Sequence, residues 1–234
     1  VAMATGTASG KTLGYLLPVL AATADGTVGF DIDHGPLDLG RRHSAIYLAP
    51  TKALAHDQAR VCRSLALPGW RTTTLDGDSS TEERRFARDF GRYVLTNPDM
   101  LHRSVLPRHQ QWTRLLSTLR YVVIDEAHRY RGVFGAHVAA VLRRLRRLAN
   151  HYGADPVFVS ASATVADAGG LLSLLAGVDD VLEVAADTSR RAALDYLIWQ
   201  PEADPHHEAA DMLARLVSEG RQTLAFTTSR VQAE

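Results

Sequence analysis

The chain has 234 residues, of which 46% are hydrophobic and 22% are charged, a composition that indicates a globular protein with room for one full α/β domain and part of another. Its 26 basic residues balance its 26 acidic residues, which excludes a general attraction to polyanions, so any contact with nucleic acid must come from a local track. Cys62 is the only cysteine, which excludes an internal disulfide and a thiolate metal cage and fits a reducing compartment.

Short apolar runs alternate with helical patterns along the chain, which is typical of βαβ units and a parallel sheet buried on both faces. The expected strands are Val1–Ala4, Ala45–Ala49, Thr72–Leu75, Tyr93–Leu95, Tyr121–Ile124, Val157–Ser160 and Val181–Val184. Helices are expected between them. The pattern therefore predicts an α/β fold with a mostly parallel sheet flanked by helices.

The first expected strand leads into a loop that can bind phosphate. The loop reads Ala4-Thr5-Gly6-Thr7-Ala8-Ser9-Gly10-Lys11-Thr12 and precedes an apolar helix over Leu13–Leu20. A phosphate site needs converging backbone N–H groups, a helix N-terminus, a lysine for the phosphate oxygens and a hydroxyl for Mg²⁺. Thr7, Ala8, Ser9, Gly10, Lys11 and Thr12 supply these groups. The glycine stands at Gly6 and not at Thr5, so the strict G-x-x-x-x-G-K-[ST] pattern is not met, and an ordinary turn with a surface lysine is the alternative.

The segment after this loop carries no membrane or targeting signal. Its longest apolar stretch, Leu13–Ala22, contains Pro18 and is shorter than the roughly 20 residues that span a bilayer. We therefore expect a cytoplasmic protein with no membrane partner. Residues 25–42 hold five glycines and prolines among polar residues, which predicts a surface loop.

Two carboxylates follow the apolar strand Tyr121–Ile124, at the end where a parallel sheet presents its functional groups. Asp125 is placed there to hold Mg²⁺ through water, and Glu126 to orient and deprotonate an attacking water. A charged strand end that caps the next helix is the alternative. We expect the loop ending at Lys11 and the acidic pair at Asp125 to lie on neighbouring strand tips and to share one magnesium-bound triphosphate.

The clearest helix is predicted over Gly135–Asn150. Apolar residues recur there at helical spacing and form one stripe: Val138, Val141, Leu142, Leu145 and Leu148. The opposite face carries Arg143, Arg144, Arg146 and Arg147. We expect this basic face to be solvated, with DNA contact as the alternative.

The periodic pattern loosens between Arg190 and Pro205 and resumes as a helix over His206–Glu219 and a strand over Gln222–Thr227. This indicates a first domain at 1–190, a linker at 191–205 and the beginning of a second domain at 206–234. The chain starts at Val1, and Ser229 would begin a helix that has no end, so we expect a fragment.

Several short motifs together resemble the superfamily 2 helicases. Asp125-Glu126-Ala127-His128 resembles their DEAH form of the Walker B box, and the remaining boxes follow in the family's order. They are Ala49–Ala55 for motif Ia, Thr96–Asp99 for the T-x-P-D box, Ser162–Thr164 for motif III and Ala225–Arg230 for the start of motif IV. Each box alone is weak, but five in order are specific, and the likeness covers nearly the whole chain. The loop and the run from Asp125 to Leu148 look most like bacterial and fungal DNA helicases with a C-terminal four-cysteine domain.

This resemblance implies two RecA-like lobes, the second only begun here, and a 3′-to-5′ DNA-unwinding motor of DNA repair that uses ATP and Mg²⁺. It implies that Lys11, Asp125 and Glu126 are catalytic, that Thr12 and Asp125 hold the metal, and that His128, Ser162 and Thr164 couple the nucleotide state to lobe closure. It also implies contacts to a single-stranded DNA track from Thr51, Lys52, Thr96, Asn97 and Asp99. Motifs V and VI and the cysteine domain are absent from this chain, so slow turnover is expected.

The residues leave several interpretations open. Helix capping by Thr51, a simple turn at Asn97–Asp99 and a buried Ser162/Thr164 pair would also explain these positions. An RNA helicase is a competitor, because phosphate contacts barely distinguish the sugars unless a 2′-hydroxyl is read. A nucleotide-binding remnant without catalysis, or another class of P-loop protein, are the further alternatives, and no motif indicates the oligomeric state.

Overall fold

The computed structural model describes residues 1–6, 10–24, 43–67, 70–163, 165–186 and 193–227. The chain divides into two compact units, Val1–Ser189 and Arg190–Glu234. The surface loop expected at 25–42 lies outside the described residues.

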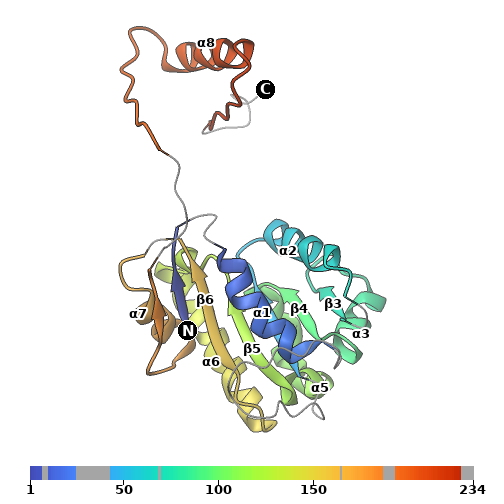
Figure 1. The fold of residues 1–234 in the computed structure, drawn as a ribbon. Helices are drawn as coiled ribbons and strands as arrows, with labels where there is room; N and C mark the ends of the chain where they lie inside the picture. The colour runs from blue at the N-terminus through green and yellow to red at the C-terminus, as the bar shows by residue number, and fades with distance from the viewer. Residues whose placement is uncertain (7–9, 25–42, 68–69, 164, 187–192, 228–234) are drawn as a thin grey trace. The chain divides into compact units, whose positions relative to one another are not determined.

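A parallel sheet of seven strands organises the described part of the first unit (Figure 1). Its strands are β1 (Ala2–Ala4), β2 (Ser44–Leu48), β3 (Thr72–Thr74), β4 (Tyr93–Thr96), β5 (Leu119–Ile124), β6 (Val157–Ser162) and β7 (Glu183–Val184). They are arranged in the order β3-β4-β2-β5-β6-β1-β7, and every pairing is parallel. The expected α/β fold with a parallel sheet is confirmed.

Helices connect these strands and cover both faces of the sheet. They are α1 (Lys11–Thr23), α2 (Lys52–Ser64), α3 (Thr81–Asp89), α4 (Pro98–Met100), η1 (Leu101–Val105), η2 (Leu106–Trp112), α5 (Thr113–Ser117), η3 (Ala127–Arg129), α6 (Gly132–His151) and α7 (Ala168–Ala176). Residues of α1 and α2 share one core cluster with the sheet, and residues of η1, η2, α5, α6 and α7 share the other. Each face of the sheet is therefore buried.

Strand β2 shows why its sequence reads as a continuous apolar run. Ala45 and Tyr47 belong to the cluster on the α1 and α2 side, whereas Ile46 and Leu48 belong to the opposite cluster. Successive side chains of a strand point to opposite faces. A strand that is covered on both faces must therefore be apolar at every position.

Helix α6 buries the predicted apolar stripe, but its basic face is only partly solvated. Leu142 and Leu145 are fully buried. Arg143 donates a hydrogen bond to the carbonyl of Leu174 at 2.8 Å, and Arg146 donates to the carbonyl of Gly177. Both carbonyls lie at the C-terminal end of α7, where backbone acceptors are left without helical partners and attract cations. Arg143 and Arg147 are exposed, as expected of a solvated face, while Arg143 and Arg146 also bind the end of α7.

The strand order corrects one further expectation. β1, which precedes the loop ending at Lys11, pairs with β6, and β6 in turn pairs with β5, which precedes Asp125. The two strands are therefore not neighbours, because β6 lies between them. They still end at the same edge, since Ala4 pairs with Ser162 and Ile124 pairs with Ser160.

The second unit contains helix α8 (Pro205–Ser218), close to the helix expected at His206–Glu219. In its first turn, the Glu208 carboxylate accepts hydrogen bonds from residues that precede the helix: from the backbone N–H groups of Glu202 and Ala203 at 2.9 and 2.6 Å and from Trp199 Nε1 at 2.9 Å. The strand expected at Gln222–Thr227 is not formed. A strand needs a hydrogen-bonding partner, and the described residues of this unit contain no other strand. None of the described helices combines the length and apolarity that crossing a membrane requires.

Candidate functional site

The described part of the phosphate-type loop ends in a glycine that starts helix α1. Gly10 has φ 82°, in the left-handed region, and is the N-cap of the helix that begins at Lys11. Glycine adopts this conformation at little cost. Gly10 has no side chain that could cap α1, and the N–H groups of a helix N-terminus can bind an anion. Thr7, Ala8 and Ser9 lie outside the described residues.

The Lys11 side chain folds back over this loop. Its Nζ donates to the carbonyl of Thr5 at 2.7 Å and to the carbonyl of Gly6 at 2.6 Å. These two bonds hold the ammonium beside the described part of the loop. Lys11 and the half-buried Thr12 therefore fit the roles expected of a phosphate lysine and a metal-binding hydroxyl.

The Asp125 carboxylate is fixed at both oxygens. Oδ2 accepts a hydrogen bond from the Tyr47 hydroxyl at 2.5 Å, and Oδ1 accepts one from the backbone N–H of Glu126 at 2.9 Å. The backbone N–H of Asp125 donates to Leu48 at 2.9 Å and so continues the pairing of β5 with β2. The carboxylate is half-exposed at the carboxyl edge of the sheet. A carboxylate that is oriented in this way can bind a hydrated cation.

Glu126 lies in the turn that follows, with a backbone conformation unusual for its type. Its φ of 49° and ψ of 42° fall in the left-handed region, which a residue other than glycine occupies only where the surrounding structure holds it. The turn redirects the chain into η3. It leaves the Glu126 side chain 38% exposed and therefore accessible to water.

His128 joins this turn to the end of β6. Its Nδ1 lies 3.2 Å from Ser162 Oγ and 3.3 Å from Glu126 Oε2. Ser162 is buried, so a change at Glu126 can reach the end of β6 through one imidazole. The insertion of β6 between β1 and β5 makes this contact possible. Thr164, the third residue expected to take part, lies outside the described residues.

Buried tyrosines form a row behind the acidic pair. The rings of Tyr15 on α1 and Tyr47 on β2 lie 6.0 Å apart, and those of Tyr47 and Tyr93 on β4 lie 6.2 Å apart. Burial, followed by the negative charge of Asp125, raises the pKa of Tyr15 and Tyr47 above their ordinary value. Both phenols are therefore protonated at neutral pH, and Tyr47 is a donor to Asp125. No sequence motif marked this row, although tyrosine is an unusual choice inside an otherwise aliphatic strand.

Two of the residues expected to contact nucleic acid cap helices. Thr51 Oγ1 accepts from the backbone N–H of Leu54 at 3.4 Å at the start of α2, and Asn97 Oδ1 accepts from that of Met100 at 2.9 Å at the start of α4. The capping alternative therefore holds for Thr51, whereas Asn97, for which a simple turn was the alternative, caps the short helix α4. Both residues nevertheless stand at the carboxyl edge of the sheet, because they follow β2 and β4.

The other expected contacts differ in exposure. Lys52 is exposed and forms an ion pair with Asp78 at 2.6 Å. Thr96 is 1% exposed, and its hydroxyl donates to the carbonyl of Leu75 at 2.7 Å, so its side chain points into the fold and not toward a ligand. Asp99 is exposed. The structure brings Lys52, Asn97 and Asp99 to the same edge and keeps the Thr96 side chain inside.

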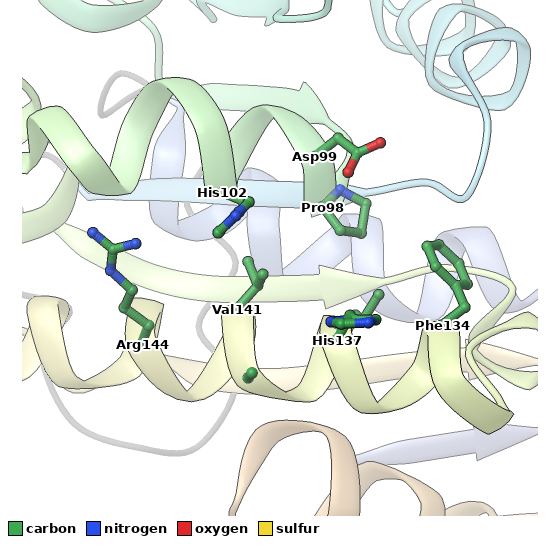
Figure 2. Close-up of a pocket in the computed structure, with 9 residues that line it drawn as sticks. Pro98, Asp99, His102, Phe134, His137, Val141 and Arg144 are labelled. Carbon is green, nitrogen blue, oxygen red and sulfur yellow. The ribbon is translucent and has the colours of Figure 1, made fainter.

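Asp99 also lines a groove that the sequence did not reveal. The groove has a volume of about 370 Å³ and is bordered by Pro98, Asp99, His102, Phe134, His137, Val138, Ala140, Val141 and Arg144. Figure 2 shows side chains of α4 and η1 facing those of α6 across it. Its residues come from segments more than thirty positions apart, which local patterns do not connect.

A parallel sheet with an anion-ready loop after one strand and an acidic pair after another, both at the carboxyl edge, defines a P-loop nucleotide-binding protein of the RecA-like class. Comparison with known families then gives the particular family. The sequence profile described as "DEAD/DEAH box helicase" matches residues 1–169. The chain belongs to the DEAD/DEAH box helicase family, and the resemblance inferred from the motifs is confirmed.

Known relatives agree with this assignment. The chain is 39% identical to "Uncharacterized ATP-dependent helicase YprA" of Bacillus subtilis, over 98% of this chain and 30% of that protein. It is 32% identical to "ATP-dependent helicase hrq1" of Schizosaccharomyces pombe, over 100% of this chain and 22% of that protein. The structure of the DUF1998 helicase MrfA bound to DNA and AMPPNP superposes with a TM-score of 0.82 and 37% identity, over 98% of this chain and 32% of MrfA. The chain therefore spans less than a third of the length of these relatives.

Proposed function

We propose that this chain is the nucleotide-binding part of an ATP-dependent DNA helicase or translocase, in which hydrolysis of Mg-ATP is coupled to strand separation. The observation that carries the proposal is the shared edge of the sheet: Lys11, the Asp125–Glu126 pair and the His128–Ser162 contact all stand at the carboxyl ends of β1, β5 and β6. An ATP-driven motor needs a phosphate site, a metal site, a general base and a residue that couples the nucleotide state to movement of the domains. Each of these has a candidate residue there.

The residues divide the work as follows. The N–H groups after Gly10 and the Lys11 ammonium bind phosphate oxygens, and Thr12 and Asp125 hold the magnesium ion. Mg²⁺, when bound, neutralises charge on the phosphate oxygens. Glu126 orients the attacking water and accepts its proton. His128 and Ser162 relate the state of Glu126 to the end of β6, with Thr164 as the third member of this group.

A second lobe would complete the motor. We infer that 1–190 is the first RecA-like domain, 191–205 a linker and 206–234 the beginning of a second RecA-like domain. Motors of this kind receive arginines from the second lobe, and such a finger is typically worth about 10³ to 10⁵ in rate. The chain alone is therefore a slow ATPase that still binds Mg-ATP.

DNA is the nucleic acid that we propose for the intact protein. The MrfA structure, at 37% identity to this chain, contains bound DNA, and Thr51, Lys52, Asn97 and Asp99 stand together at one edge of this sheet. Short polar side chains and backbone amides at such an edge contact phosphates of a single strand. Thr96 takes part only through its backbone, since its side chain is buried.

The choice of nucleic acid can be tested on the intact protein. We expect single-stranded DNA to stimulate its ATP hydrolysis more than RNA of the same sequence and length. Parallel steady-state assays at one fixed salt concentration would measure this, because phosphate contacts weaken as salt rises. Equal or greater stimulation by RNA would favour the RNA helicase alternative.

Lys11→Met tests the phosphate site itself. We expect it to weaken ATP binding by about 10- to 100-fold, because a hydrogen bond to a charged group is worth roughly 1.5–3 kcal/mol. Displacement of a fluorescent ATP analogue would measure the change. Lys52→Met is a matched control, since Lys11 and Lys52 are the only lysines in the chain, and in the absence of DNA it should bind ATP like the wild type. Unchanged ATP affinity in the Lys11→Met protein would remove the phosphate site from the proposal.

A further inference from the structure

We propose that Tyr47 is a positioning residue for the metal site, because its hydroxyl holds the Asp125 carboxylate in the orientation that receives the nucleotide-bound cation. The inference rests on the proposed function, since it assumes that Asp125 faces a magnesium ion. It concerns a residue outside the motifs, on the strand that precedes the Ala49–Ala55 box.

The contact between the two residues is short and shielded. Tyr47 Oη donates to Asp125 Oδ2 at 2.5 Å, and the Tyr47 side chain is 1% exposed. β2 and β5 are neighbours, and Tyr47 pairs with Val123 while Leu48 pairs with Ile124. The tyrosine ring therefore lies on the α1 and α2 side of the sheet, and its hydroxyl reaches the carboxylate that follows β5. A buried donor that is fixed in this way cannot be replaced by water.

The hydrogen bond to Asp125 distinguishes Tyr47 from Tyr93 in the same row. Tyr93 is also buried, but among the described residues its hydroxyl has no hydrogen-bond partner. A tyrosine that only filled space at position 47 would need no hydrogen-bond partner for its hydroxyl. The Tyr47 hydroxyl instead contacts Asp125, the carboxylate to which we assign the metal ion.

Tyr47 also lies between the two halves of the metal site. Its hydroxyl contacts Asp125 after β5, and its ring lies 6.0 Å from the ring of Tyr15 on α1. Tyr15 is one helical turn after Thr12, on the helix that begins at Lys11. One side chain thus sets the spacing between the helix that carries Thr12 and the strand that carries Asp125.

The consequence for the cation is a carboxylate that is oriented before the metal arrives. With Oδ2 bonded to Tyr47 and Oδ1 bonded to the Glu126 N–H, rotation of the carboxyl group is blocked, and each oxygen keeps one lone pair for a metal-bound water. Groups that orient a ligand in this way typically contribute about 10- to 100-fold to metal affinity. Without the phenol, Asp125 must be ordered by the ion itself.

The test is metal affinity, measured apart from catalysis. Mn²⁺ would be titrated into the intact protein saturated with a non-hydrolysable ATP analogue, and free Mn²⁺ would be followed by electron paramagnetic resonance. We expect Tyr47→Phe to weaken Mn²⁺ binding by about 10-fold and to leave the affinity for the nucleotide in EDTA unchanged. Tyr93→Phe is the matched control, because it removes a buried hydroxyl from the same row without touching Asp125, and it should bind Mn²⁺ like the wild type.

The outcomes separate this inference from the proposed function. Wild-type protein that binds no metal with the nucleotide would overturn both. Wild-type binding with equal affinity in Tyr47→Phe would overturn only the role of Tyr47, and equal weakening in Tyr93→Phe would reduce it to a general packing effect.

A second measurement does not depend on the folding of Tyr47→Phe. 3-Fluorotyrosine placed at position 47 keeps the hydroxyl, and its ¹⁹F resonance should move when Mg²⁺ is added to the nucleotide-bound protein. The ¹⁹F resonance of the same label at position 93 should not shift. An unchanged ¹⁹F chemical shift at position 47 while Mg²⁺ binds would contradict the proposal.

Discussion

Glu126→Gln is expected to lower the rate of ATP hydrolysis by the intact protein by about 10²- to 10⁴-fold, because a positioned general base contributes an acceleration of that size. Glutamine keeps the shape of the side chain but cannot accept the proton of the attacking water. Binding of Mg-ATP should persist, since the phosphate and metal contacts are assigned to Lys11, Thr12 and Asp125. Single-turnover hydrolysis and equilibrium binding of the nucleotide would measure the two effects separately.

The matched control for this variant is Glu82→Gln. Glu82 is exposed in the first turn of α3, away from the acidic pair, and its replacement should leave hydrolysis unchanged. If Glu126→Gln retained the wild-type rate, another group would have to be the base. If it lost nucleotide binding as well, the strained turn at Glu126 would be the affected feature and not the proton transfer.

Leu142→Ala is expected to lower the free energy of unfolding by about 2–5 kcal/mol, the usual cost of truncating a fully buried leucine. Leu142 is 0% exposed, at the centre of the α6 stripe that packs on the sheet. The truncation removes packing contacts and leaves a cavity, because both α6 and the sheet are held by neighbours and cannot close the gap. Urea unfolding of the 234-residue chain, followed by circular dichroism, would measure the loss.

Leu174→Ala is the control for that measurement. Leu174 lies on α7 and is 68% exposed, so the same chemical change should alter stability by less than about 0.5 kcal/mol. A loss below about 1 kcal/mol in Leu142→Ala would show that α6 is not fixed on the sheet as described. That result would also count against the described geometry of the site, because the turn from Asp125 to Tyr130 leads directly into α6.

The position of β6 bears on how the site could respond to its nucleotide. The Lys11 loop and Asp125 were expected on adjacent strands, whereas β6 separates them. The separation places Ser162 beside His128 at 3.2 Å, between the phosphate loop and the acidic pair. Ser162 also pairs with Ala4, so the end of β6 lies beside both the strand before the phosphate loop and the turn after β5.

Local features of the sequence determined most of the elements of this protein and the family to which it belongs. The strands, the loop before Lys11 and the acidic pair after Ile124 each lie within about ten consecutive residues, where period-2 runs and turn residues are informative by themselves. The strand expected at Gln222–Thr227 failed because a strand is defined by its partner, and the pattern alone does not supply one.

Only the tertiary structure decided the relations between these elements. The strand order places β6 between β1 and β5. The Thr96 side chain points inward and donates a hydrogen bond to the carbonyl of Leu75. The hydrogen bond from Tyr47 to Asp125 joins residues 78 positions apart. The groove beside Asp99 likewise needs helices from two distant segments. The physical reason is that periodicity reports which face of an element is buried, whereas the identity of the neighbour depends on how the crossovers pack over the whole sheet.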